Sequence, residues 1–198
     1  MDVRLSLRHP RYLLGQRLSP LQIAAALLLL LASDWASLHA GSSFLPGGPL
    51  DETAHLLTAL LLLQALPPRP RARIALPALV GSVAIDLDHV PQSLGHYFLT
   101  AGTARPYTHS LLTIVVLLAI ALAARRRRQL FLGLALGVGL HFFRDLAEGG
   151  GGGVPLLWPF TDHAFSYAHG TYLALMVCVA AADAYLAAFS LRARPAAP

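Results

Sequence analysis

Lysine is absent from this chain of 198 residues, cysteine occurs once, and only 13% of the residues are charged. Soluble domains contain about 25% charged residues on average. The scarcity of charge therefore argues against a soluble globular domain, and the lone Cys178 excludes a disulfide within the chain. Hydrophobic residues make up 56% of the sequence, which favours a protein embedded in a membrane.

Six long apolar segments account for this composition. A helix needs about 20 predominantly apolar residues to cross the hydrocarbon core of a bilayer. Some of the segments reach that length only when their polar ends are included. They are residues 21–38, 56–66, 74–85, 111–124, 130–143 and 171–189. We therefore predict an all-α fold, a polytopic membrane helical bundle with about six transmembrane helices.

The distribution of the arginines tests this topology. If all six segments cross the membrane, thirteen of the fifteen arginines lie on one side, and only Arg105 and Arg144 lie on the other. Arginine-rich loops normally stay in the cytoplasm, so both termini are predicted to be cytoplasmic. These arginines lie in short loops at the membrane surface, so the net charge of +5 does not indicate a nucleic-acid partner.

The whole chain, residues 1–198, is predicted to form a single membrane-embedded domain. It comprises a basic cytoplasmic N-terminal segment (1–18), a helical bundle (19–191) and a short cytoplasmic tail (192–198). The first apolar segment is long for a signal peptide, and the small residue expected three positions before a cleavage site is missing. We therefore expect an uncleaved first span.

Histidines and carboxylates follow the opposite distribution from the arginines. Apart from His9, the histidines fall at the outer ends of predicted spans or in outer loops, as do most carboxylates. His141 and Asp145 are four residues apart and share one face of a helix. Asp86 and His89 also converge if their helix continues to His89. Ionisable groups at this membrane depth indicate a functional site.

Four predicted spans each bring a nitrogen or oxygen donor to this level, with His55 opening the second span and His109 opening the fourth. A set of histidines and aspartates without cysteine suits zinc, and manganese or iron less exclusively. The predicted metal ligands are His55, Asp86, His89, His109, His141 and Asp145. Water bound to such a metal ionises near neutral pH, so the set predicts hydrolytic chemistry.

Three further polar residues accompany the predicted ligands. Asp88 is placed either to hold the far nitrogen of a ligating histidine or to act as a general base. Arg105 has a guanidinium group that suits a phosphate or a carboxylate, and the alternative is a pairing with an outer carboxylate. Arg144 follows the ligand face of its helix less well, so we expect it to form a salt bridge or to lie at the interface.

Five short motifs stand in order along residues 50–160. They are "ETAHLL" (52–57), "AIDLDH" (84–89), "RPYTHS" (105–110), "HFFRD" (141–145) and "GVPLLWPF" (153–160). Their order and approximate spacing resemble the YdjM-like family of bacterial inner-membrane proteins, which is classed with metal-dependent hydrolases. The family is similar in motif style to zinc-dependent phospholipase C. The resemblance implies a multi-pass protein of the bacterial inner (cytoplasmic) membrane, and it adds Thr108 to Asp88 and Arg105 as catalytic residues.

The chain departs from the family pattern at three positions. Ala104 stands where the family has a histidine, Pro106 where it has a glycine, and Ile85 where it has a proline. The change at Ala104 removes one ligand, which His163 or His169 could replace. The number of metal ions therefore stays open.

We expect a hydrolase that cleaves a phosphoester with metal-activated water at the extracytoplasmic face of the membrane. A site at the membrane surface favours a lipid or lipid-linked substrate taken from the bilayer. A lipid phosphatase is one alternative, but the PSGH element that its nucleophilic histidine requires is missing. The other alternative is a non-catalytic membrane protein, either metal-handling or a scaffold, in which the histidines and aspartates form a structural cluster.

Overall fold

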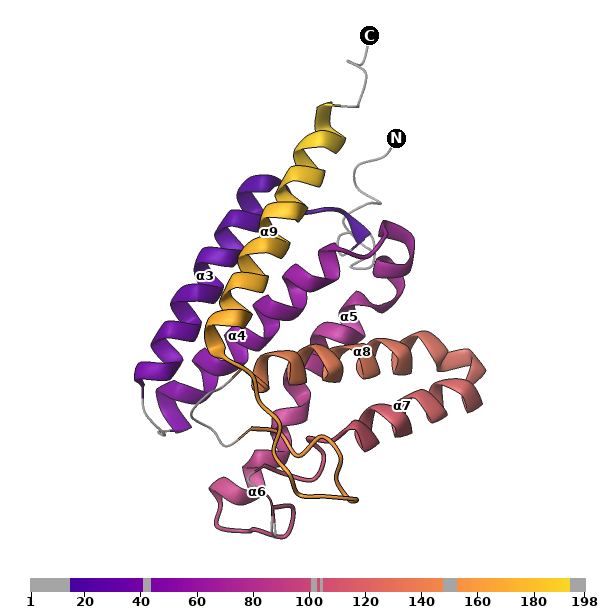
Figure 1. The fold of residues 1–198 in the computed structure, drawn as a ribbon. Helices are drawn as coiled ribbons and strands as arrows, with labels where there is room; N and C mark the ends of the chain where they lie inside the picture. The colour runs from indigo at the N-terminus through magenta and orange to yellow at the C-terminus, as the bar shows by residue number, and fades with distance from the viewer. Residues whose placement is uncertain (1–14, 41–43, 101–102, 104, 148–152, 193–198) are drawn as a thin grey trace.

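The computed structural model describes residues 15–40, 44–100, 103, 105–147 and 153–192, so most of the predicted segment 1–18 and of the tail 192–198 lies outside it. Within the described residues, extended structure is limited to one isolated bridge between Val154 and Phe165. The elements in chain order (Figure 1) are α3 (Pro20–His39), α4 (Phe44–Gln64), α5 (Pro68–Ala84), the 3-10 helix η1 (Ile85–Asp88), α6 (His89–Ser93), α7 (Leu111–Ala123), the 3-10 helix η2 (Arg125–Arg127), α8 (Arg128–Asp145) and α9 (His169–Arg192). The predicted all-α class is confirmed.

Local sequence signals explain where the helices begin. The Ser19 hydroxyl accepts a hydrogen bond from the Gln22 backbone N–H at 3.3 Å, and the Gln22 side chain accepts one from the Ser19 N–H at 2.9 Å. This reciprocal capping satisfies two N–H groups that the first turn of α3 would otherwise leave unpaired. Proline occupies the first helical position of α3 (Pro20) and of α5 (Pro68), where its missing N–H has no cost.

Helix α4 begins earlier than the sequence predicts. The sequence analysis places His55 at the opening of the second span. In the structure α4 begins at Phe44, and His55 lies in the middle of the helix. The helix therefore extends beyond the apolar segment, and the point where the span begins stays a prediction. Ala54 and His55 are buried, and α4 packs on α8, so this tertiary packing outweighs the low helix propensity of the residues before His55.

Helices α3, α4 and α9 pack side by side, and the pair α7 and α8 runs across them at a steep angle (Figure 1). The core between α3, α4 and α9 is formed by fully buried side chains such as Leu30, Leu61 and Met176. Tyr172 of α9 is buried in the same core, and its hydroxyl lies 2.6 Å from the Thr58 hydroxyl of α4. The buried Tyr172 is thus paired with a polar group rather than left unsatisfied.

Glycines allow α8 to approach α5 closely. The sequence "GLALG" (133–137) places Gly133 and Gly137 on one face of α8. A Cβ at Gly137 would clash with the Ala78 carbonyl of α5, and a Cβ at Gly81 would lie 2.7 Å from the Leu134 carbonyl oxygen. Small residues at four-residue spacing are a common way for membrane helices to bring their backbones together. This contact fixes α8 against α5.

The outer surface of the bundle is apolar. Leu28 of α3, Leu122 of α7 and Phe189 of α9 are each more than half exposed. Three helical stretches are long and apolar enough to cross a membrane: Pro20–His39, Pro68–Ser93 and His169–Phe189. Helix α7 is apolar but shorter, so the other three predicted spans stay a prediction.

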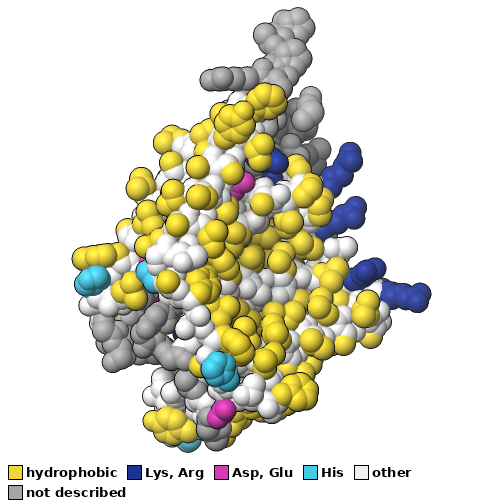
Figure 2. Space-filling view, viewed as in Figure 1, with side chains coloured by type: hydrophobic (Ala, Val, Ile, Leu, Met, Phe, Trp, Pro, Cys, Tyr) yellow, Lys and Arg dark blue, Asp and Glu magenta, His cyan; other side chains and the backbone are white. Residues whose placement is uncertain are grey.

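The charged side chains of the visible face separate by type. Figure 2 shows arginines gathered along one edge and histidines toward the opposite part of the molecule, with hydrophobic side chains over most of the surface between them. The beginning of α5, η2 and the beginning of α8 supply arginines at one end of these helices. The separation agrees with the expected sorting, and the side of the membrane on which each end lies stays a prediction.

Candidate metal centre

The predicted ligands meet where η1, the loop before α7 and the end of α8 converge on the middle of α4. Helix α5 ends at Ala84 and the chain continues through η1 into α6, so Asp86 and His89 follow one another on a tight turn. The Asp86 Oδ1 and His89 Nε2 atoms lie 3.6 Å apart, as the spacing predicts. On α8, the pair four residues apart also converges: His141 Nε2 lies 3.0 Å from Asp145 Oδ2.

Four donor atoms form the centre of the cluster: Asp86 Oδ1, His109 Nε2, His141 Nε2 and Asp145 Oδ2. The His109 Nε2 atom lies 3.1 Å from Asp86 Oδ1 and 3.2 Å from His141 Nε2. It lies 3.5 Å from Asp145 Oδ2, and the distance from His141 Nε2 to Asp86 Oδ1 is 3.4 Å. Ligands bound at about 2.0–2.1 Å to a tetrahedral zinc ion stand about 3.3 Å apart. The distances from the two histidine nitrogens to each other and to both carboxylates therefore match the spacing of donors in a tetrahedral metal site.

The far nitrogens of the two central histidines are held by acceptors. His141 Nδ1 donates to the Ser82 carbonyl oxygen at 2.9 Å. His109 Nδ1 donates to Asp88 Oδ2 at 3.1 Å, and the Thr108 hydroxyl donates to the same carboxylate. Because the far nitrogens are held in this way, both rings can present the Nε2 lone pair to a metal ion at the centre. Metal-bound histidines in proteins are commonly oriented in this way.

Lone pairs that face one another repel unless a cation lies between them. The two Nε2 atoms face each other and two carboxylates, in a place where His109, His141 and Asp145 have no exposed surface. Without a metal, only protons can bridge these atoms. Burial lowers the pKa of His109, but hydrogen bonds to Asp86 and Asp88 outweigh it and raise the pKa above the usual value. The residues present thus fit a divalent metal ion.

His55 lies beside this centre. Its ring stacks on His141 with a centroid distance of 3.8 Å, and its Nε2 lies 3.3 Å from Asp145 Oδ1. The same nitrogen lies 3.0 Å from Arg144 Nη1 and 3.7 Å from Asp51 Oδ2. His55, His141 and Asp145 form one group whose donor atoms could hold a metal ion. The neighbouring guanidinium of Arg144 competes for the His55 lone pair.

His89 lies at the more accessible side of the cluster. Its side chain is 34% exposed, and its Nε2 lies 3.8 Å from Asp88 Oδ1. His89 belongs with Asp86, Asp88 and His109 to a second group of donors close enough to share an ion. The Asp88 Oδ1 atom is buried and makes no hydrogen bond within the described part of the chain, so it is available to a ligand.

The structure places Arg105 against Asp145. Arg105 Nη1 donates to Asp145 Oδ2 at 3.0 Å, and the Arg105 side chain is 12% exposed. Of the two expectations for Arg105, this geometry corresponds to pairing with a carboxylate. The pairing reduces the negative charge of the centre.

Arg144 forms the salt bridges expected of it. Its Nη2 lies 3.0 Å from Asp34 Oδ1 of α3, and its Nη1 contacts the Asp51 carboxylate of α4. Sequence reasoning missed Asp51 as a neighbour of the centre, although its spacing of four residues from His55 was a usable signal. The pairing with Asp34 spans 110 residues and has no local signal.

Neither proposed replacement for the missing histidine reaches the described donor groups. His169 Nε2 lies 2.9 Å from Asp34 Oδ2, on the far side of Arg144. The His163 ring packs edge-on against Phe165 with a centroid distance of 4.9 Å. Ala104 itself lies outside the described residues.

The fold and the site together define a helical membrane protein with a buried acid–histidine centre. The family model of the YdjM inner membrane protein matches residues 50–195, which include every residue of this centre. The chain belongs to the YdjM inner membrane protein family. No curated protein and no solved structure matches it.

Proposed function

We propose that this chain is a membrane-bound, metal-dependent hydrolase that cleaves a phosphoester of a lipid or lipid-linked substrate. One observation carries the proposal. Two buried imidazole nitrogens, whose rings are held by acceptors, lie together with the buried Asp145 and the partly buried Asp86 at distances that suit donors around one metal ion.

Zinc suits the donor set best, and manganese and iron are the alternatives. Asp86, His109, His141 and Asp145 would hold the ion, with His55 and His89 at the two sides of the centre. A bound divalent ion activates water and withdraws charge from a phosphoryl oxygen. The remaining chemistry belongs to the side chains around it.

Three residues are assigned to the substrate. Arg105, which pairs with Asp145 at the centre, would add positive charge for a phosphate oxygen of the substrate. The free Asp88 Oδ1 accepts a proton from the attacking water, while Asp88 Oδ2 keeps His109 in place. The Thr108 hydroxyl, which donates to Asp88, holds that carboxylate in its orientation.

The surroundings of the centre favour a lipid substrate. Leu87, between the two aspartates of η1, is 69% exposed, and Phe98 and Phe160 in neighbouring loops are 67% and 93% exposed. Large apolar side chains around a polar centre suit a substrate that remains partly in the bilayer. The sorting of arginines supports a multi-pass protein of the inner membrane with cytoplasmic termini, about six spans and a site facing the periplasm.

The metal content of the purified protein tests the proposal. Protein prepared in detergent without added metal should contain near-stoichiometric zinc, manganese or iron by plasma mass spectrometry. His109→Ala and Asp86→Ala should lose the metal while their helical circular dichroism is unchanged. His96→Ala, which removes an exposed histidine outside the cluster, is the matched control and should keep it. Wild-type protein that stays metal-free after supplementation would sink the hydrolase proposal.

One observation favours the non-catalytic alternative. Arg105 and Arg144 already pair with Asp145, Asp34 and Asp51, so part of the acidic charge is balanced without a metal. A metal-free wild type would point to this structural network in a scaffold. Metal-loaded protein that releases no headgroup from phospholipids and no product from model phosphoesters would point to metal handling instead.

A further inference from the structure

A large cavity lies between α5 and the beginning of α8, away from the candidate metal centre. Its volume is about 540 Å³, within the range of about 300–1,000 Å³ that is usual for ligand pockets. Arg73 and Asp86 are separated along α5 and η1 by about 20 Å at the rise of a helix. The cavity therefore belongs to the arginine-rich end of these helices and not to the acid–histidine end.

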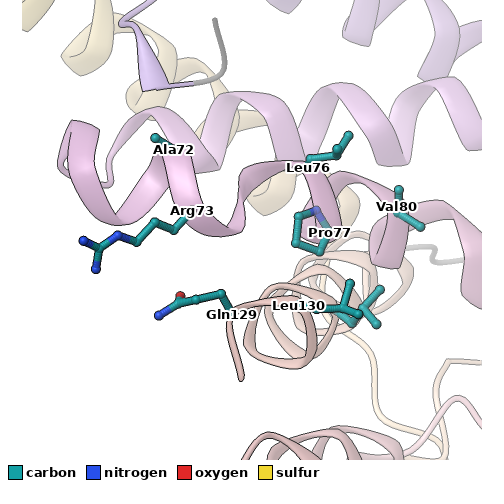
Figure 3. A pocket seen from close by; sticks show the side chains of 8 residues that line it. Ala72, Arg73, Leu76, Pro77, Val80, Gln129 and Leu130 are labelled. Carbon is teal, nitrogen blue, oxygen red and sulfur yellow. The ribbon is translucent and has the colours of Figure 1, made fainter. Parts of the chain in front are cut away.

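The cavity is apolar along its length and polar at one end. Leu76, Pro77 and Val80 line it from α5, and Leu130 lines it from α8. Figure 3 shows Arg73 and Gln129 extending side by side at one end, beyond the apolar side chains. None of the described lining residues is acidic. An apolar groove that ends in a cation and an amide matches an acyl chain that ends in a phosphate.

Neighbouring arginines add to the positive charge of this end. The 3-10 helix η2 (Arg125–Arg127) and Arg128 directly precede Gln129 on the chain. The side chains of Arg73 and Gln129 are exposed, as are large parts of Leu76 and Val80. The groove is therefore open to the surface along its apolar part and at its polar end.

We propose that this groove binds one anionic phospholipid, with the phosphate at Arg73 and Gln129 and an acyl chain along Leu76, Val80 and Leu130. Basic pockets between membrane helices are suited to anionic headgroups. A zwitterionic lipid would gain little from Arg73 because its own ammonium group cancels the attraction. The proposal stands independently of the hydrolase activity, because no residue of the metal centre takes part in it.

The test is native mass spectrometry of the full chain released from nanodiscs of equimolar phosphatidylcholine and phosphatidylglycerol. The wild type is expected to retain phosphatidylglycerol in preference to phosphatidylcholine. Arg73→Gln is expected to lower this preference about fivefold, the factor for one arginine near an anionic lipid. Arg69→Gln, one turn earlier on α5, changes an exposed arginine outside the cavity lining and should preserve the preference.

A second variant keeps the test independent of Arg73. Gln129→Glu places a negative charge at the same end of the groove and should weaken phosphatidylglycerol retention at least as much. Equal losses in Arg69→Gln and Arg73→Gln would overturn the proposal in favour of diffuse attraction to the arginine-rich surface. Equal retention of both lipids by the wild type, or a protein dimer in place of the lipid adduct, would overturn it as well.

Discussion

Two arginines are buried in the described part of the chain, and their surroundings differ. Arg144, near the end of α8 that carries the acid–histidine centre, is 2% exposed, and Arg71, near the start of α5, is 0% exposed. Arg144 pairs with the carboxylates of Asp34 and Asp51. Arg71 donates to the Gln64 backbone carbonyl at 3.0 Å, to Gln64 Oε1 at 3.1 Å and to the Gly15 carbonyl at 2.9 Å.

The difference separates two uses of a buried cation. The Arg71 guanidinium donates its hydrogen bonds to neutral oxygens and ties the chain before α3 to the α4–α5 connection. The buried Asp183 carboxylate of α9 interacts with it only at longer range, without a direct ion pair. The Arg144 guanidinium compensates two carboxylates and contacts the His55 ring. Removing it would leave the buried Asp34 and the partly exposed Asp51 without this cation, which costs more than losing bonds to neutral groups. The electrostatics of Arg144 and of the metal centre are therefore coupled through His55.

The largest effect is expected from Arg144→Met, which should lower the free energy of unfolding by about 3–5 kcal/mol. The loss arises because the buried Asp34 and the partly exposed Asp51 lose the cation that they share. Unfolding in detergent at fixed metal concentration measures it. The double variant Arg144→Met/Asp34→Asn should recover part of the loss. A loss no greater than that of Arg71→Met would abolish the distinction between the two arginines.

Arg71→Met should lower the free energy of unfolding by a smaller amount, about 2–3 kcal/mol. The variant leaves the Gln64 and Gly15 carbonyls without their donor, but it breaks no direct ion pair and removes only a longer-range attraction to Asp183. The same unfolding measurement applies, and metal content should be unchanged because Arg71 is far from the centre. Arg69→Met, at an exposed position of the same helix, serves as the control and should have little effect. Loss of metal in Arg71→Met would contradict the conclusion that the arginine-rich end of the helices is separate from the acid–histidine centre.

Gly137→Ala tests the close contact between α8 and α5. The added Cβ would clash with the Ala78 carbonyl, and the overpacking should cost about 1–2 kcal/mol after the gain in helix propensity. Gly139→Ala on the same helix is the control, since its Cβ would meet its nearest atom at 3.8 Å. The control should be neutral or slightly stabilising. Equal behaviour of the two variants would argue against a close approach of α5 and α8.

The smallest effect is expected from His169→Ala, which should lower the free energy of unfolding by less than about 1 kcal/mol. His169 contacts Asp34 at 2.9 Å but is partly exposed, and Arg144 still pairs with Asp34 in the variant. Thermal unfolding beside His163→Ala, which changes an exposed histidine, measures the difference. A cost comparable to that of Arg144→Met would show that His169, and not Arg144, is the main partner of Asp34.

Much of the fold follows from patterns of neighbouring residues. The long apolar runs predict the long helices, and Ser19 with Gln22 marks the beginning of α3. The early start of α4 could not be predicted, because its local propensity is poor and buried contacts with other helices stabilise it. The position of α8 on α5 depends on the glycines of "GLALG", whose partner helix a single sequence does not identify.

The contacts of the candidate site are also of two kinds, those between neighbouring residues and those between distant segments. The pairs Asp86 with His89 and His141 with Asp145 follow from helical spacing, and the structure brings both together. Pairings between distant segments have no periodicity to reveal them. The position of Arg105 against Asp145 bridges 40 residues, and it depends on how the loop before α7 folds over the end of α8.

The tight turn of η1 determines how His109 can move. Asp86 contacts its Nε2 atom at 3.1 Å, and Asp88 contacts its Nδ1 atom at 3.1 Å. A half-turn of the ring about its axis would break both contacts at once. His109 is therefore held in one orientation and cannot carry a proton by rotating its ring. A proton that passes through His109 has to arrive at one ring nitrogen while another leaves from the opposite nitrogen, between the two aspartates that hold the ring.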